Sequence, residues 1–266
     1  MAATGTLSND MKTILRIDEI QKKFQTEQGS RITALKDVSF EVQANDFICI
    51  VGPSGCGKST LLRIIAGLER ASAGRVLYHN EPVTSPDRRI GMVFQEYSLF
   101  PWRTVIDNVA SGLEFAGETQ DASANTALDY LKLVGLEQFA QAFPHELSGG
   151  MRQRVAIARS LAVEPDVLLM DEPFGALDAY TRIVLQKELL RTWEHKRQTI
   201  LFVTHSVDEA IFLADRIFVM SKTPGRIREI IEVPMERPRD RVNPIYGALT
   251  ERILSMLEDE TSGVLH

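Results

Sequence analysis

Nine consecutive residues have the types and spacing needed to hold phosphate groups. They are Gly52, Pro53, Ser54, Gly55, Cys56, Gly57, Lys58, Ser59 and Thr60. Two glycines with four residues between them, followed by Lys and then Ser, match the phosphate-loop pattern. Glycines let a backbone curl so that successive N–H groups point at phosphate oxygens. Lys58 would then reach the β- and γ-phosphates of a nucleotide, and the Ser59 hydroxyl would ligate Mg²⁺.

The sequence on both sides of this loop predicts the elements that the loop requires. Residues 47–51 form a short continuous apolar run, the pattern of a strand buried on both faces. Residues 59–66 have helical spacing, and a helix starting near Lys58 would direct its positive dipole end at the phosphates. Cys56 is either a small residue at a permissive position or a thiol whose pKa the helix N-terminus lowers. The alternative to the whole pattern is a glycine-rich turn that binds nothing.

Two carboxylates follow a second apolar run, residues 167–170. Asp171 is positioned to hold Mg²⁺ through water, and Glu172 would polarise an attacking water. Kinases transfer phosphate to a bound acceptor and do not need the second carboxylate. The pair therefore favours hydrolysis, with an ordinary acidic pair at a strand end as the alternative.

A second helix start has phosphate-binding character. Ser148 is a candidate N-cap, and Gly149 and Gly150 follow it ahead of a helical pattern at 152–159. A helix N-terminus with a serine and two exposed glycines can hold a phosphate. One chain with two such helix ends predicts a composite site shared between two copies.

The apolar patterns predict an α/β fold with a mostly parallel core sheet. Further strands are expected at 74–78, 89–94, 199–203 and 217–220, and further helices at 181–195 and 207–214. Buried strands that alternate with helices indicate a sheet covered on both faces. By contrast, residues 14–24 and 32–42 predict an antiparallel pair joined by a polar turn at 25–31.

The order of these patterns predicts a single domain, residues 1–266, with an insertion. The nucleotide-binding core is expected at 14–94 and 163–234. Residues 95–162 are helix-rich, with breaks at Pro101, Gly112, Gly117, Gly135 and Pro144. The tail, residues 235–266, contains an amphipathic stretch at 245–257 and is expected to pack on the core.

Composition excludes several classes of protein. The chain has 266 residues, 44% apolar and 25% charged, which is typical of a soluble globular protein. The net charge of −6 disfavours a nucleic-acid partner. Two cysteines fit a reducing compartment. Residues 1–10 lack the apolar centre of a secretory signal, and no apolar run approaches the ~18 residues of a membrane span.

Taken in order, these motifs resemble the ATP-binding cassette (ABC) ATPases over about residues 14–234. The resemblance rests on the phosphate loop, Gln95, the signature Leu147–Met151, the pair Asp171 and Glu172, the segment Ala176–Asp178, and His205. The family's signature usually ends in Gln, whereas here it ends in Met151. The resemblance implies a P-loop fold with an antiparallel β subdomain and an inserted helical subdomain, and it implies ATP and Mg²⁺ as ligands.

The resemblance also implies a role for each motif residue. Glu172 would be the general base, His205 would hydrogen-bond the γ-phosphate, and Gln95 would contact Mg²⁺ and sense a transport partner. Phe24 lies where an aromatic residue stacks on adenine in the family, unless it is a plain core phenylalanine. Asp178 would couple the two nucleotide sites.

The family further implies a partner protomer. Ser148, Gly149 and Gly150 would contact the γ-phosphate bound on the opposite protomer. A homodimer, or a dimer with a paralogous ATPase, would close head to tail around two MgATP. The open and closed states would be the two ends of a mechanical switch.

A run of aromatic residues at 97–109 favours a membrane importer. Phe100 and Trp102 lie on a predicted loop beside Gln95 and suggest a docking groove for a partner helix, unless they pack the helical block. The run resembles the importer branch that serves nitrate, aliphatic sulfonates, taurine and bicarbonate. This branch implies transmembrane permease subunits, a periplasmic or lipoprotein solute-binding protein, and a peripheral position on the cytoplasmic face of the inner membrane.

Other members of the family remain alternatives. They are the ATPases of polyamine, molybdate and phospholipid importers, and a soluble single-cassette ATPase such as one in iron–sulfur cluster assembly. A DNA-repair or translation factor of the superfamily would need a coiled-coil insertion or two tandem cassettes, and the chain has neither. Solute identity would reside in the permease and the binding protein.

Overall fold

The computed structural model describes residues 12–25, 29–175, 177–196 and 198–262. The polar segment 1–10, part of the predicted turn at 25–31, and Ala176 of the predicted motif lie outside the described residues.

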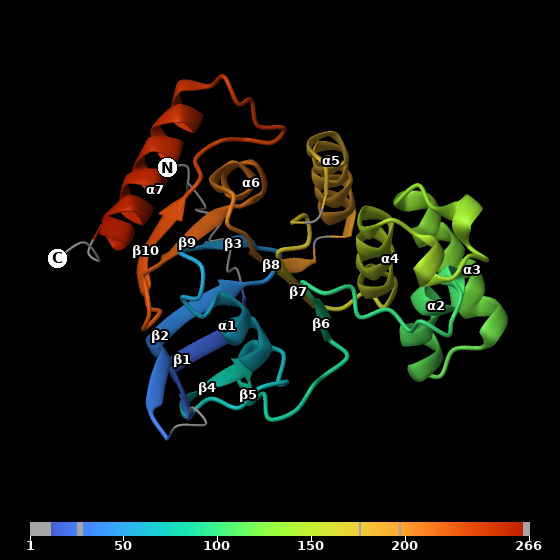
Figure 1. Ribbon diagram of the computed structural model, residues 1–266, viewed down its shortest axis with the longest axis horizontal. Helices are drawn as coiled ribbons and strands as arrows, with labels where there is room; N and C mark the ends of the chain where they lie inside the picture. The colour runs from blue at the N-terminus through green and yellow to red at the C-terminus, as the bar shows by residue number, and fades with distance from the viewer. Residues whose placement is uncertain (1–11, 26–28, 176, 197, 263–266) are drawn as a thin grey trace, which may run out of the picture.

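A six-stranded sheet runs through the centre of the molecule (Figure 1). Its order is β10-β9-β3-β8-β7-β6, and the strands are β3 Phe47–Val51, β6 Ile90–Val93, β7 Val167–Asp171, β8 Thr199–Val203, β9 Arg216–Met220 and β10 Ile227–Glu232. Every residue of β3, β7 and β8 is buried, because the sheet is covered on both faces. The predicted buried strands are therefore confirmed. All neighbours pair in parallel except β10, which pairs antiparallel with β9 at the edge.

A second, antiparallel sheet has the order β2-β1-β4-β5. Its strands are β1 Thr13–Gln25, β2 Arg31–Gln43, β4 Ala73–Tyr78 and β5 Glu81–Pro82. Helix α1 (Lys58–Ile65) lies between the two sheets (Figure 1). Its Leu61 and Leu62 are fully buried in one core cluster with Ile17 of β1 and Phe218 of β9. This packing fixes the start of α1 against both sheets.

Three helices between β6 and β7 form a separate group on the right of Figure 1. They are α2 Val105–Phe115, α3 Gln120–Leu133 and α4 Gly149–Ala162, with two short 3₁₀ turns at Glu137–Phe139 and Pro144–Glu146. Gly112 lies inside α2, so the predicted break at this glycine is wrong. A Cβ on Gly112 would come within 2.5 Å of Val163 Cγ2, so the glycine permits close packing of α2 against the end of α4.

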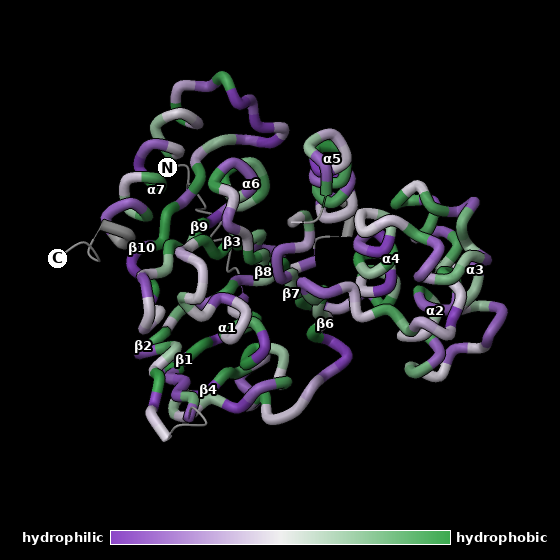
Figure 2. Tube along the Cα trace, viewed as in Figure 1, coloured by the Kyte–Doolittle hydropathy of each residue, from purple (hydrophilic) through white to green (hydrophobic). Residues whose placement is uncertain are grey.

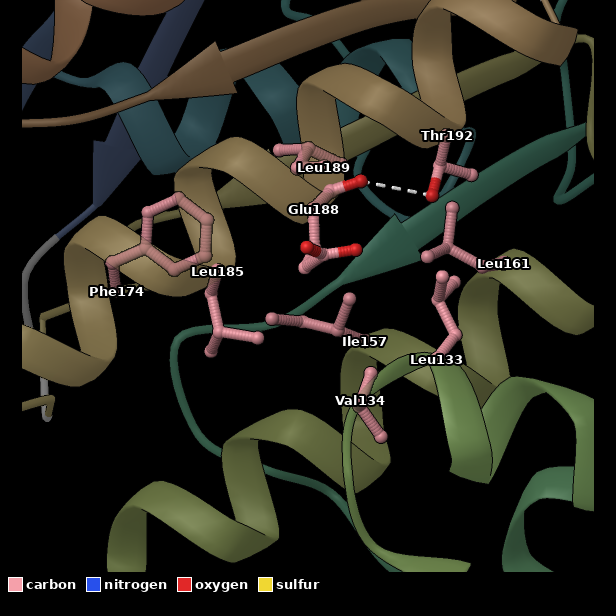
Figure 3. A pocket seen from close by; sticks show the side chains of 9 residues that line it. All are labelled: Leu133, Val134, Ile157, Leu161, Phe174, Leu185, Glu188, Leu189 and Thr192. Atoms are coloured by element: carbon pink, nitrogen blue, oxygen red, sulfur yellow. Dashed lines mark hydrogen bonds between the residues drawn. The ribbon is translucent and has the colours of Figure 1, made fainter.

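The helical group meets the core where α4 packs near α5 (Ala179–Lys196). A small cavity of about 20 Å³ lies at this joint (Figure 3). Its lining is mostly apolar: Leu133, Val134, Ile157, Leu161, Phe174, Leu185, Glu188, Leu189 and Thr192. The Thr192 hydroxyl donates to the Glu188 carbonyl at 2.9 Å, which satisfies the one hydroxyl in the lining.

The tail forms a long helix, α7 (Pro244–Ser262), that packs on α6 (Val207–Leu213). The predicted amphipathic stretch at 245–257 lies within it. The Tyr246 hydroxyl donates to Asp208 Oδ1 at 2.6 Å, and Arg228 of β10 donates to the Met256 carbonyl at 2.7 Å. Hydrophilic and hydrophobic residues intermix along the helices (Figure 2), and no described helix is long and apolar enough to cross a membrane.

Candidate nucleotide site

The carboxyl ends of four parallel strands meet at one edge of the central sheet. In the register, Ile50 of β3 and Asp171 of β7 both lie beside Val203 of β8, and Val93 of β6 lies beside Met170. The residues that follow these strands therefore leave the sheet at the same edge. This edge is where open α/β sheets bind their ligands.

The phosphate loop has the backbone that the sequence predicts for it. Gly55 and Gly57 have φ values of 76° and 101°, in the left-handed region that favours glycine. A Cβ on Gly57 would lie 2.7 Å from Leu35 Cδ2, so only glycine fits. Gly57 is also the N-cap of α1, and no side chain caps this helix end. The first N–H groups of α1 are thus available to an anion.

Lys58 is a buried cation inside this loop. Its side chain is 6% exposed, and its Nζ donates to the carbonyls of Gly52 at 2.8 Å and Pro53 at 3.0 Å. Among the described residues, it makes no hydrogen bond to a carboxylate. A buried charge without a counter-charge is costly. The phosphates of a nucleotide would supply this counter-charge, so the loop suits them as ligands.

Ser59 and Asp171 are brought together across the sheet edge. The Ser59 hydroxyl donates to Asp171 Oδ1 at 2.9 Å. Burial raises the pKa of Asp171, against the effect of this hydrogen bond. Hydroxyl and carboxylate oxygens are ligands that suit Mg²⁺, which usually takes one or two carboxylates plus phosphates and water. Gln95, two residues beyond β6, is exposed at the same edge.

Glu172 and His205 also meet. His205 Nδ1 lies 3.2 Å from Glu172 Oε2, at the ends of β7 and β8. Both side chains are accessible, the histidine at 60% and the glutamate at 23%. The backbone of Glu172 has a φ of 47°, and its N–H donates to the Val203 carbonyl at 3.0 Å. This turn lifts the carboxylate out of the sheet edge toward solvent.

Phe24 lies at the end of β1 and is 40% exposed. The alternative interpretation, that Phe24 is buried in the core, is therefore wrong. Lys22 Nζ stands 4.8 Å from its ring centroid. The other predicted loop residues, Pro53, Ser54 and Thr60, are half-buried or exposed.

The interpretation of Cys56 as a thiol with a lowered pKa is wrong. The side chain is 1% exposed. Burial raises the pKa of its thiol, and the nearby Lys58 offsets this only in part. Cys56 therefore serves as a small buried residue under the loop.

The signature residues form a helix cap that stands apart from the phosphate loop. Ser148 is the N-cap of α4, and its Oγ accepts from the Met151 N–H at 3.3 Å. A Cβ on Gly149 would lie 2.9 Å from Tyr97 Oη, whereas Gly150 faces Leu177. Helix α4 belongs to the helical group, and α1 lies between the sheets on the other side of the molecule (Figure 1). Within one chain the two helix ends do not form one site.

Asp178 precedes α5. Its Oδ1 accepts from the Thr181 N–H at 3.0 Å, and this hydrogen bond lowers the pKa of the exposed carboxyl. Asp178 thus caps α5. The residue predicted to couple the two nucleotide sites is therefore attached to the long helix that packs near α4.

Known proteins match this chain along most of its length. The ABC transporter family model matches residues 35–175. The chain belongs to the ABC transporter ATPase family. An uncharacterized ABC transporter ATP-binding protein of Methanocaldococcus jannaschii is 50% identical over 94% of this chain and 93% of its own length. The aliphatic sulfonates import ATP-binding protein SsuB of Bacillus cereus is 43% identical over 91% of this chain and 95% of its own.

Solved structures agree with this assignment. A dimeric ATP-binding cassette in a post-hydrolysis state, bound to ADP and Pi, has a TM-score of 0.77 and 33% identity to this chain. The match covers 84% of this chain and 100% of that one. The P-loop ABC fold, with its parallel core, antiparallel sheet and helical insertion, is therefore confirmed. This ABC ATPase hydrolyses ATP as a transporter subunit.

Sequence reasoning missed a buried polar cluster behind His205 in this ABC ATPase. Glu209 is 5% exposed, and the Thr204 hydroxyl donates to it at 2.5 Å. Gln186 and Arg182 of α5 approach the same carboxylate at 3.4 and 3.5 Å. Burial raises the pKa of Glu209. The only signal in the sequence was a carboxylate four residues after His205, on what the apolar pattern presents as an ordinary helix.

Proposed function

We propose that this ABC ATPase energises uptake of a small anion of the nitrate, sulfonate, taurine or bicarbonate type through a membrane permease. The observation that carries the proposal is the 43% identity, over 91% of this chain, to an aliphatic sulfonates import ATP-binding protein. Its working position would be peripheral, on the cytoplasmic face of the inner membrane. A periplasmic or lipoprotein solute-binding protein would deliver the solute to the permease.

Two copies of the chain, or one copy and a paralogous ATPase, would share two nucleotides. The separation of Ser148 from the phosphate loop supports this arrangement, because the N-terminus of α4, with its exposed serine, would then face a phosphate bound by another copy. The dimeric state of the solved relative bound to ADP and Pi also supports it. Ser148, Gly149 and Gly150 would complete the γ-phosphate site of the partner, and Asp178 would couple the two sites.

Hydrolysis would use positioning and electrostatics rather than covalent chemistry. Lys58 and the N–H groups of α1 would hold the β- and γ-phosphates, with Phe24 against the adenine. Mg²⁺, held by Ser59, Gln95 and Asp171, would neutralise developing charge on the phosphates. Glu172 would take a proton from the attacking water.

His205 is positioned for a second role in the same step. Its contact with Glu172 Oε2 uses Nδ1, which leaves Nε2 for the γ-phosphate. A histidine in contact with both Glu172 and the γ-phosphate would hold the attacking water between them, in line for attack on the phosphate. This proposal depends on the 3.2 Å separation of the two side chains.

The permease would dock on the aromatic loop beside Gln95. Trp102 is 72% exposed and Phe115 is 75% exposed, and the ring of Trp102 lies 5.6 Å from that of Phe100. Arg103 stands within 6 Å of the rings of Phe100 and Phe115. Exposed aromatic groups of this size mark interaction surfaces. A helix of the permease would bury them.

An affinity pull-down from native membranes in mild detergent tests this proposal. Mass spectrometry should identify a multi-span permease with the ABC ATPase. The companion binding protein should then bind nitrate, a sulfonate, taurine or bicarbonate in a titration. Recovery with cytosolic partners alone would refute the importer and favour a soluble single-cassette ATPase. A binding protein selective for polyamine, molybdate or phospholipid would refute the solute class.

A further inference from the structure

A cleft of about 750 Å³ lies between α5, α6 and the segment that joins β10 to α7. In Figure 1 this orange segment passes above α6 and extends toward α5. The cleft is lined by Lys187, Leu190, Arg191, Glu194, Phe212, Arg237, Pro238, Arg239, Asp240 and Arg241. Five of these side chains are cationic and two are anionic, in a chain whose net charge is −6.

Three of the five cations already have carboxylate partners. Arg237 pairs with Asp215 at 2.6 Å, and Arg241 pairs with Asp208 at 2.8 Å. Arg191 pairs with Glu188. These pairs hold the walls of the cleft in place. Arg239 and Lys187 are the two lining cations for which no pair has been described so far.

Arg239 is the unusual member of the set. Its side chain is 6% exposed, and it has no carboxylate partner among the described residues. It donates from Nη1 to the Ile211 carbonyl at 2.7 Å and from Nε to the Met235 carbonyl at 3.2 Å. An arginine has five N–H donors, so three remain. Burial, and then the charge of Arg237, lower the pKa of Arg239 to about 10.

The cleft also has an apolar floor. Phe212 of α6 and Leu190 of α5 are both buried and line it. The Arg241 guanidinium lies 4.3 Å from the Phe212 ring centroid, which keeps this wall rigid. Lys187 also lines the cleft, is exposed, and has no carboxylate partner within the described ranges. An apolar floor beside unpaired cations suits a ligand with an anionic head and a short apolar body.

We propose that this cleft is a second ligand site, distinct from the nucleotide site, for a small organic anion with a sulfonate, carboxylate or phosphate head. Arg239 binds the head, Lys187 closes over it, and the apolar part lies on Leu190 and Phe212. The ligand joins α5 to the segment before α7. Since Asp178 caps α5, occupancy of the cleft stabilises the helix that this residue caps.

Tryptophan fluorescence gives a direct test, because the chain has only two tryptophans. A Trp102→Phe variant retains Trp193 alone. The ring centroid of Trp193 lies 4.4 Å from Cζ of Arg237, which lines the cleft. Hexanesulfonate, hexanoate and inorganic phosphate are titrated at constant ionic strength, with saturating MgADP in the nucleotide site. Hexanol serves as the uncharged probe. We expect a saturable change with hexanesulfonate or hexanoate, with a Kd on the order of 1 mM.

Variants then locate the binding. Arg239→Gln should raise the Kd about tenfold, because it removes a charged hydrogen-bond donor, and Lys187→Gln should raise it about threefold. Lys132→Gln, on the exposed face of α3, should leave it unchanged. Lys187 is exposed, so its variant remains informative even if Arg239→Gln does not fold. A response to phosphate but not to hexanesulfonate would exclude the apolar floor and refute the organic ligand.

Three further results would overturn the site: no saturable response to any anion, equal affinity in both cleft variants, or equal affinity for hexanol. A separate titration with MgADP alone measures binding at the nucleotide site. Failure of MgADP to bind would refute the nucleotide site and leave the result for the cleft intact.

Discussion

Replacement of Glu172 by Gln should stop hydrolysis and leave ATP binding intact. The side chain is 23% exposed, and the contact that fixes its backbone is a main-chain hydrogen bond to Val203. Gln has the same shape and a similar tolerance of the φ of 47°, so we expect the free energy of unfolding to change by less than about 0.5 kcal/mol. A general base contributes about 10²- to 10⁴-fold in rate. The activation free energy should rise by about 2.7 to 5.4 kcal/mol.

The assay is single-turnover hydrolysis of radiolabelled ATP, with the oligomeric state followed by light scattering. The variant should accumulate as a dimer with ATP bound. Glu19→Gln is a matched control, because Glu19 is also a glutamate with positive φ (49°) and lies on β1. Wild-type turnover in Glu172→Gln would refute the assignment of the base. A variant that stays monomeric with ATP would refute the composite site.

Four further outcomes are expected. Lys58→Ala should abolish ATP binding in an equilibrium titration, because the loop loses its buried cation; normal affinity would contradict the phosphate-loop assignment. Cys56 should react with a thiol reagent at pH 8 only after denaturation, with or without ATP, since burial raises its pKa; rapid labelling of the native protein would contradict its burial. Trp102→Ala should leave the basal ATPase within about twofold of wild type and weaken membrane association in a flotation assay; unchanged flotation would exclude this docking surface. Hydrogen bonds from Arg89 lower the pKa of Asp87 to about 2, so their stabilisation is present above about pH 4 and is lost as the pH falls through 2. Chemical denaturation should show that Asp87→Asn lowers the free energy of unfolding at pH 7, and that this deficit shrinks toward pH 2.

The nucleotide edge was predictable because its signals are local. A phosphate loop needs consecutive residues of fixed type, and the flanking strand and helix are encoded by short periodic patterns. Strand ends then converge because parallel strands share an edge. Ser59 and Asp171 are 112 positions apart and lie 2.9 Å from each other, yet each was visible in its own local pattern, Ser59 at the start of the helix after the phosphate loop and Asp171 at the end of a buried strand.

What the sequence did not reveal depends on tertiary packing. β10 has alternating burial at the sheet edge, and its three charged side chains, those of Arg228, Glu229 and Glu232, interrupt the apolar pattern that would have predicted a strand. Gly112 lies inside a helix, at a position where Val163 leaves no room for a side chain, and this close contact is not visible in the sequence. Glu209 and Arg239 are charged residues, and nothing in their neighbours along the chain indicates that both are buried.

The apolar cavity between α4 and α5 makes the molar volume of the molecule depend on its conformation. Close-packed interiors compress little, so empty space is where a protein can lose volume. A displacement of α4 along α5 would change the volume of this space. Hydrostatic pressure favours the arrangement of smaller volume. Compression, with no change in ligand or temperature, would therefore act on how α4 packs against α5, and so on the joint between the helical group and the core.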